Sequence, residues 1–176
     1  MGAGQLTLLA LVALLAAGCQ GSGEAETTAT TGGTAAVVEW VNDGDTLTLT
    51  NGAKVRLVQI DAPELGTDCY GRAALKALVS LAPKGTRVRL ASDPELDDRD
   101  RYGRLLRYVF VRGVNVNVEL VRAGAASPYF FRRERGRYAG RLLEAVDEAR
   151  DGRRGYWGAC PAAKLNTGLG SVTGRR

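Results

Sequence analysis

The stretch Val41–Glu64, VNDGDTLTLTNGAKVRLVQIDAPE, decides the fold of this chain. Two runs in it, residues 46–50 and 55–60, alternate with the period of two that is typical of half-buried strands. Asn51-Gly52 between the runs favours the positive φ angles of a tight two-residue hairpin turn. The hairpin therefore brings its two acidic ends together, Asp43-Gly44-Asp45 and Asp61-Ala62-Pro63-Glu64. Oxygen ligands gathered there suit a hard cation such as Ca²⁺.

The rest of the pattern predicts one α+β domain over residues 37–161. A strand at 37–41 precedes the hairpin, and two more are expected at 86–91 and 105–112. Helices are expected over 70–82, 117–123 and 133–150, with Asn117 capping the second and Gly124 ending it. One helix after the third strand and others after the fifth indicate a five-stranded OB-type β-barrel with about three packed helices.

The segment before this domain is typical of an exported protein. Residues 1–19 hold an apolar run, Leu6–Ala17, that is too short to span a membrane, and they end in Ala-Ala-Gly-Cys. This ending resembles a lipobox, in which Cys19 would become the lipid anchor to a membrane; a plain cleaved secretion signal is the alternative. We therefore expect export, either as a membrane-anchored lipoprotein or as a secreted or periplasmic protein.

Two further segments have the composition of chain that does not fold. Residues 20–36 are small and polar, and they predict a flexible linker between the leader and the domain. Residues 162–176 are Gly-rich and end in Gly-Arg-Arg, which predicts a largely disordered tail.

The charge of the expected domain favours a polyanionic partner. Beyond residue 36 the chain has 24 basic and 17 acidic residues, a net charge of +7. Twenty of the basic residues are Arg, which suits bidentate phosphate contacts, although a GC-rich genome would give the same bias. The sequence contains no His, which excludes an imidazole base and argues against a zinc site of the usual kind.

The sequence contains three cysteines. If Cys19 takes a lipid, Cys69 and Cys160 remain as an even pair in an oxidising compartment. A disulfide between them would close a loop of about 90 residues and contribute up to about 4–5 kcal/mol on the chain-entropy account. Two separate free thiols are the alternative.

Four blocks of sequence carry a family resemblance. They are Asp43-Gly44-Asp45-Thr46, Arg56 five residues before Asp61-Ala62-Pro63-Glu64, the DRYGR segment at 100–104, and Val116-Asn117 leading to the LVRAG segment at 120–124. In this order and spacing, the segment from about Val37 to Trp157 resembles the staphylococcal nuclease (thermonuclease) family. Each block alone is weak evidence, but the four together are specific.

The resemblance implies a Ca²⁺ site in the hairpin. The ion would be held by the side chains of Asp45 and Asp61 and by the carbonyl of Ala62, with Asp43 behind these ligands or at their edge. An isolated Asp-Gly-Asp is more often a polar turn before a strand. Here the return of acidic residues at the other end of the hairpin favours the metal site.

The resemblance also assigns three catalytic residues. Glu64 would act as general base toward the attacking water, or would orient that water. Arg56 and Arg104 would grip the phosphate and oppose the charge that grows on it. Exposed surface charge is the alternative for both arginines, but Arg56 alternates onto a face with apolar residues, where it needs an anionic partner.

Contacts to the rest of a nucleic acid are expected after the second helix. Tyr129 and Phe131 lie about where the family has tyrosines that stack on a base and approach a phosphate. Each of these rings, and Phe130 between them, could equally be a core anchor. The basic run Arg132, Arg133, Arg135 and Arg137 would track phosphates, or it could be a solvated helix start.

The sequence therefore predicts a Ca²⁺-dependent endonuclease. We expect a monomer that hydrolyses the phosphodiester bonds of DNA and RNA with low sequence specificity and leaves 3′-phosphate ends, as the resemblance implies. The principal alternative is a non-catalytic OB-type lipoprotein that binds nucleic acid. A structural lipoprotein of the cell envelope would explain the leader and the basic surface but not the motif residues.

Overall fold

The computed structural model describes residues 1–2 and 32–174, and the folded unit begins at Gly32. Cys19 and most of the expected leader and linker lie outside the described residues, so the lipobox stays a prediction. Within the described part, no helix is both long enough and apolar enough to cross a membrane.

A closed β-barrel forms the body of the fold. Its strands pair in the order β3-β2-β1-β5-β6, and β6 closes the barrel by pairing with β3. The β3–β6 pair is parallel and the others are antiparallel, so the barrel is mixed. The expected five-stranded OB-type barrel is therefore confirmed. The barrel strands are β1 (Thr34–Val41), β2 (Thr46–Leu49), β3 (Lys54–Leu57), β5 (Arg87–Ala91) and β6 (Leu105–Val111).

Apolar side chains of the alternating runs fill the barrel and its contact with the helices. Val38, Leu47, Val55, Leu57 and Val109 are all fully buried. They join one cluster with residues from the helices, so barrel and helices share a single core. Burying each such side chain contributes about 1.5–3 kcal/mol, which makes this cluster the main stabilising element.

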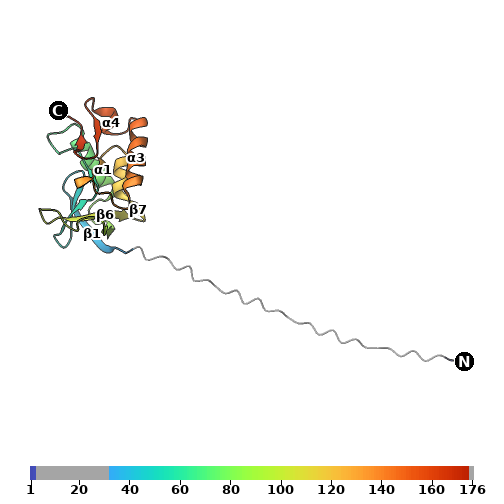
Figure 1. Cartoon of the computed structure of the whole chain (residues 1–176). Helices are drawn as coiled ribbons and strands as arrows, with labels where there is room; N and C mark the ends of the chain where they lie inside the picture. Colours follow the sequence, from blue (N-terminus) through green and yellow to red (C-terminus); the bar gives the residue numbers. More distant parts are fainter. Residues whose placement is uncertain (3–31, 175–176) are drawn as a thin grey trace. The chain divides into compact units, whose positions relative to one another are not determined.

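Three main helices cover one side of the barrel, and Figure 1 shows α1 and α3 above the strands β1 and β6. The helix α2 contacts both α1 and α3. The helices are α1 (Gly71–Leu81), α2 (Val116–Arg122) and α3 (Ala139–Asp151), followed by the single turn α4 (Tyr156–Ala159). The expectation that the last helix begins at 133 was wrong. Arg132 and Arg133 have positive φ angles, which leave only a short 3₁₀ turn, η1 (Phe131–Arg133), before α3.

The role expected of Asn117 was also wrong. The residue that caps α2 is Asn115, whose side chain accepts a hydrogen bond from the Val118 N–H. Asn117 is completely buried instead. Its amide accepts from the Val109 N–H at 2.9 Å and donates to the carbonyl of Val58 at 2.9 Å. Asn117 therefore joins α2 to two segments of the barrel.

The hairpin formed by β2 and β3 differs from expectation in two ways. The register that pairs Thr48 with Lys54 leaves Thr50–Gly52 as a three-residue loop, in which Gly52 has the positive φ. The second run is not one strand over 55–60, because Gln59 has a φ of 62° and separates β3 from β4 (Ile60–Asp61). The strand β4 then pairs with β8 (Ser127–Pro128) rather than within the barrel. The break places Asp61 in a different strand from Arg56, which lies in β3.

Both ends of the domain extend beyond the predicted boundaries. β1 begins at Thr34, because Thr34–Ala36 pair with β5, and composition alone does not reveal such a partner. The expected disordered tail contains a hairpin of β9 (Lys164–Asn166) and β10 (Gly170–Val172). The small β7 (Val114–Asn115) extends the sheet beside β6.

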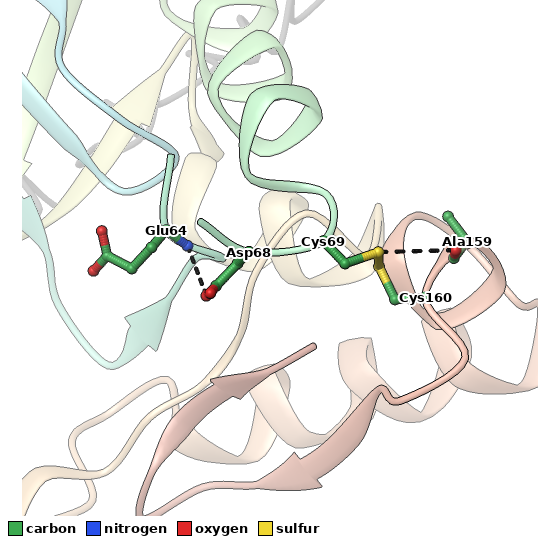
Figure 2. Close-up of a disulfide and its surroundings, with 5 residues drawn as sticks. All are labelled: Glu64, Asp68, Cys69, Ala159 and Cys160. Carbon is green, nitrogen blue, oxygen red and sulfur yellow. Dashed lines mark hydrogen bonds between the residues drawn. A yellow bond between two sulfur atoms is a disulfide. The ribbon is translucent and has the colours of Figure 1, made fainter. Parts of the chain in front are cut away.

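A disulfide joins Cys69 to Cys160, which is the pairing expected from the sequence. Figure 2 shows that it links the loop leaving Glu64 to the end of α4. The two residues are 91 apart in the sequence, so the bond ties the entry of α1 to the C-terminal part of the domain.

Candidate active site

The acidic ends of the first hairpin line a small open pocket of about 140 Å³. All the residues that the sequence assigned to metal binding or catalysis lie around it. Gly44 allows this close approach, because a Cβ there would lie 2.5 Å from the Cβ of Ala62. The lining residues are Asp43, Gly44, Asp45, Arg56, Asp61, Ala62, Pro63, Glu64 and Arg104.

Asp45 is the most deeply buried carboxylate of the pocket, with 6% of its surface exposed. Its Oδ2 accepts a hydrogen bond from the Ala62 N–H at 2.9 Å, and its Oδ1 accepts one from the Thr46 hydroxyl at 3.1 Å. Burial raises the pKa of Asp45 to about 7, although the nearby Arg56 opposes this rise. The charges of Asp43 and Asp61 add to the rise that burial causes.

Arg56 lies between the two expected metal ligands. Its Nη2 is 2.7 Å from Asp61 Oδ1 and 3.3 Å from Asp45 Oδ2. Its Nη1 donates to the carbonyls of Leu57 and Ile60, at 3.2 and 2.8 Å. Burial acts to lower the pKa of Arg56, but Asp45 and Asp61 outweigh burial and raise it. Both terminal nitrogens of the guanidinium are therefore engaged, and the side chain is held in one place.

Arg104 reaches the pocket from the turn before β6. Its Nε donates to Asp100 Oδ2 at 2.7 Å, and its Nη1 lies 3.3 Å from the Thr46 hydroxyl. Burial acts to raise the pKa of Asp100, but hydrogen bonds from the side chain and backbone of Arg104 hold it below its usual value. Since Nη2 makes no hydrogen bond in the described structure, Arg104 keeps a donor edge for a ligand.

Glu64 is the exposed carboxylate at the rim of the pocket. Its N–H donates to Asp68 Oδ2 at 3.0 Å, and its carbonyl accepts from the Asp68 N–H at 3.1 Å. Figure 2 shows its carboxylate pointing away from Asp68 and from the disulfide. Partial burial and the charges of Asp43 and Asp61 raise the pKa of Glu64. A carboxylate with a raised pKa and no hydrogen-bond or ion-pair partner among the described residues is suited to accept a proton.

The pocket offers a hard cation few protein ligands. Among the described residues, no three side chains of His, Cys, Asp or Glu are grouped closely enough to hold a metal by themselves. The available donors are the carboxylates of Asp45 and Asp61 and the carbonyl of Ala62. Asp43 Oδ1 accepts a hydrogen bond from the Asp45 N–H at 3.0 Å. Oxygen donors of this kind fit a hard divalent ion that keeps several waters.

The aromatic residues expected to contact substrate have different surroundings. Phe130 is buried in the core, whereas 52% of Phe131 is exposed, with the Arg132 guanidinium 5.0 Å from its ring centre. Tyr129 is half-buried, and its N–H donates to the carbonyl of Gln59. The basic run is exposed and precedes α3 rather than starting it. None of these residues lines the pocket.

Sequence reasoning gave no role to three residues that hold the site. Thr46 connects Asp45 to Arg104, and Asp100 fixes the Arg104 side chain. Thr46 and Asp100 belong to the DGDT and DRYGR motifs. Their polar side chains next to charged residues could have indicated a role in the site. Ser171, whose N–H donates to Asp61 Oδ2 at 2.8 Å, lies in the segment expected to be disordered.

Comparison with known proteins agrees with this geometry. A sequence model of the family described as Staphylococcal nuclease homologue matches residues 54–159. An Escherichia coli protein described as an uncharacterized endonuclease is 40% identical over 121 residues, which cover 66% of this chain and 72% of that protein. The thermonuclease of Staphylococcus intermedius is 34% identical over 103 residues, which cover 54% of this chain and 60% of that protein. The chain therefore belongs to the staphylococcal nuclease family and is a hydrolytic nuclease.

Proposed function

We propose that this nuclease is a Ca²⁺-dependent endonuclease that cleaves DNA and RNA with little sequence preference and leaves 3′-phosphate ends. The observation that supports this best is a pocket in which three aspartates, one glutamate and two arginines converge from segments far apart in the chain. Such a set can bind a phosphodiester, neutralise it and activate water.

The residues present fit a hard divalent cation. The carboxylates of Asp45 and Asp61 lie close together, and Arg56 contacts an oxygen of each in this structure. Burial of the Asp45 carboxylate disfavours its charged form, and a bound cation would offset that cost. The staphylococcal nuclease family is typically metal-dependent. When bound, Ca²⁺ would supply charge neutralisation of a phosphate oxygen and would place water near phosphorus.

The protein side chains would divide the remaining work. Glu64 accepts the proton of the attacking water, because its carboxylate lies at the pocket rim and has no other partner in the part of the chain that the structure describes. Arg104 binds a phosphate oxygen through its Nη2, while Asp100 and Thr46 hold the other side of the guanidinium. Arg56 reaches the phosphate by exchanging one of its carboxylate contacts for it. The water oxygen bonds to phosphorus as the bond from phosphorus to the 5′-oxygen breaks. The 5′-oxygen takes a proton from solvent, and the phosphate remains on the 3′ side.

Plasmid DNA and a single-stranded RNA, each incubated with Ca²⁺ and then with excess EGTA, test this proposal. We expect cleavage of both in Ca²⁺, 3′-phosphate ends and no cleavage after chelation. Glu64→Gln should lose at least about a hundredfold in kcat while Tm is unchanged, since Glu64 is exposed. Leu65→Gln, at the exposed neighbouring position, is the matched control. Cleavage that EGTA does not affect would refute the metal assignment, and full activity of Glu64→Gln would refute the role of this residue.

We also propose that the protein is exported and anchored through a lipid on Cys19. The support is the sequence alone: an apolar run followed by Ala-Ala-Gly-Cys and a small polar segment. Expression of the full chain and of Cys19→Ser in a bacterium, followed by membrane fractionation, tests the anchor. We expect the membrane fraction to hold the unaltered chain and to lose the variant. Equal distribution of the two would refute lipidation.

A further inference from the structure

The C-terminal hairpin β9–β10 contacts the active site through Asp61. The backbone N–H of Ser171 donates to Asp61 Oδ2 at 2.8 Å, and the Ser171 hydroxyl donates to the carbonyl of Asp61. The other carboxylate oxygen, Oδ1, accepts from Arg56. Each oxygen of this carboxylate thus has one fixed donor. One donor is in β3 and the other is in β10, near the C-terminal end of the domain.

Gly170 allows this contact. It has a φ of +79°, and a Cβ at this position would lie 2.4 Å from Asp61 Oδ2. Any other residue would therefore be strained by the backbone angle and would displace the carboxylate or the hairpin. The neighbouring Gly168 has no such restriction, since its nearest neighbour would lie 3.5 Å from an added Cβ.

The hairpin is bound to the domain at several other points. The Phe130 N–H donates to the carbonyl of Thr167 at 2.7 Å, and the Cys69 N–H donates to the carbonyl of Gly174 at 3.0 Å. The disulfide at Cys160 fixes the chain shortly before β9. These contacts hold β10 beside β4 and β8. In each contact, one of the two partners lies beyond residue 159, where the match to the family model ends.

We infer that the hairpin 164–172 is a working part of the active centre, in which Gly170 and Ser171 position the Asp61 carboxylate for cation binding. The inference rests on the proposed function, because it takes Asp61 as a ligand of the ion. Without the hairpin, the side chain of Asp61, which has 28% of its surface exposed, could rotate about its own bonds and turn its oxygens away from Asp45. Fixing one oxygen removes that freedom before the ion arrives.

A comparison of Gly170→Ala with Gly168→Ala in the full chain tests the inference. Each variant adds one methyl group, and only the methyl group at position 170 would contact Asp61. Ca²⁺ affinity is measured by titration calorimetry without substrate, and folding by Tm in EGTA. We expect Gly170→Ala to bind Ca²⁺ at least about tenfold more weakly and Gly168→Ala to bind it within about twofold of the unaltered chain. Equal or tighter binding by Gly170→Ala would overturn the inference.

A second pair of variants covers the case in which Gly170→Ala does not fold. Ser171→Ala removes the hydroxyl that donates to Asp61, and Ser171→Thr restores it. We expect a severalfold loss of Ca²⁺ affinity in the first and recovery in the second, and equal affinities would overturn the inference. If the unaltered chain binds no Ca²⁺, the proposed cofactor is refuted instead. The variants are then compared by kcat in the divalent ion that supports cleavage, where equal values would again overturn the role of the hairpin.

Discussion

Replacing Asp45 by Asn should make the metal-free protein more stable and the nuclease inactive. Asp45 is buried, and burial raises its pKa from 3.8 to about 7. A carboxyl group whose pKa is higher in the folded than in the unfolded state favours folding when protonated and opposes it when ionised. The side chain therefore lowers the stability of the domain at neutral pH, a cost that a bound cation would offset.

The magnitude follows from the two pKa values. Between 3.8 and about 7, each pH unit corresponds to about 1.4 kcal/mol, which gives an upper limit of about 4 kcal/mol at neutral pH. Asn keeps an oxygen for the Ala62 N–H but weakens the contact with Arg56. We therefore expect a net gain of about 1–3 kcal/mol, or about 3–10 °C in Tm. The gain should grow from pH 4 to pH 7 and stay constant above.

Thermal unfolding of Asp45→Asn and of the unaltered chain in EGTA, at pH 4.5 and pH 8, measures this gain. Asp97→Asn, which removes an exposed carboxylate outside the pocket, is the control and should leave Tm unchanged. Added Ca²⁺ should stabilise the unaltered chain and not the variant, and cleavage by the variant should be absent. A variant that is less stable than the unaltered chain at pH 8, or a gain that does not shrink at pH 4.5, would refute the reasoning.

Three other variants test the supports of the site. Asp100→Asn frees the Arg104 guanidinium and should lower kcat/KM about 10- to 100-fold in a plasmid assay, whereas Asp98→Asn on the same loop, which contacts Arg107 instead, should not. Asn117→Ala leaves the Val109 N–H and the Val58 carbonyl unpaired in the core and should lower the free energy of unfolding in urea by about 3 kcal/mol. The double variant Cys69→Ser, Cys160→Ser should lose up to about 4 kcal/mol in the same measurement, and equal urea midpoints would contradict a structural role for the bond.

The barrel could be predicted from the sequence because its strands show a local alternation of apolar and polar residues. Leu47, Val55 and Leu57 recur at the spacing of a strand, and no distant residue is needed to recognise them. The breaks in the pattern were not predictable in this way. Gln59 has a positive φ because its side chain is held from outside the hairpin: Tyr108 and the Gly136 N–H donate to its Oε1, and its Nε2 donates to the carbonyl of Glu134. Those partners lie 49 to 77 residues away, beyond any local signal.

The same distinction applies to the site. Asp43, Asp45, Asp61 and Glu64 lie at the two ends of one short stretch with a turn at its centre, so the local sequence predicts that they meet. The contact of Arg104 with Thr46 spans 58 residues and depends on the parallel pairing of β3 with β6, which a motif can indicate only by resemblance. The contact of Ser171 with Asp61 spans 110 residues and involves a backbone N–H, which every residue but proline has. A Gly-rich composition cannot distinguish such a donor from a disordered tail.

The position of these long-range contacts has a physical reason. A pocket that buries a carboxylate is unfavourable by itself, as the raised pKa of Asp45 indicates, so the chain must hold it with interactions formed elsewhere. The barrel holds Asp45 and Arg56, whereas Asp61 and Glu64 leave the barrel after Gln59 and need other support. The C-terminal hairpin holds Asp61, and the loop that carries Glu64 is closed by Asp68 and the disulfide at Cys69. The two residues that we propose to meet the ion and the water are therefore those that the C-terminal part of the domain supports.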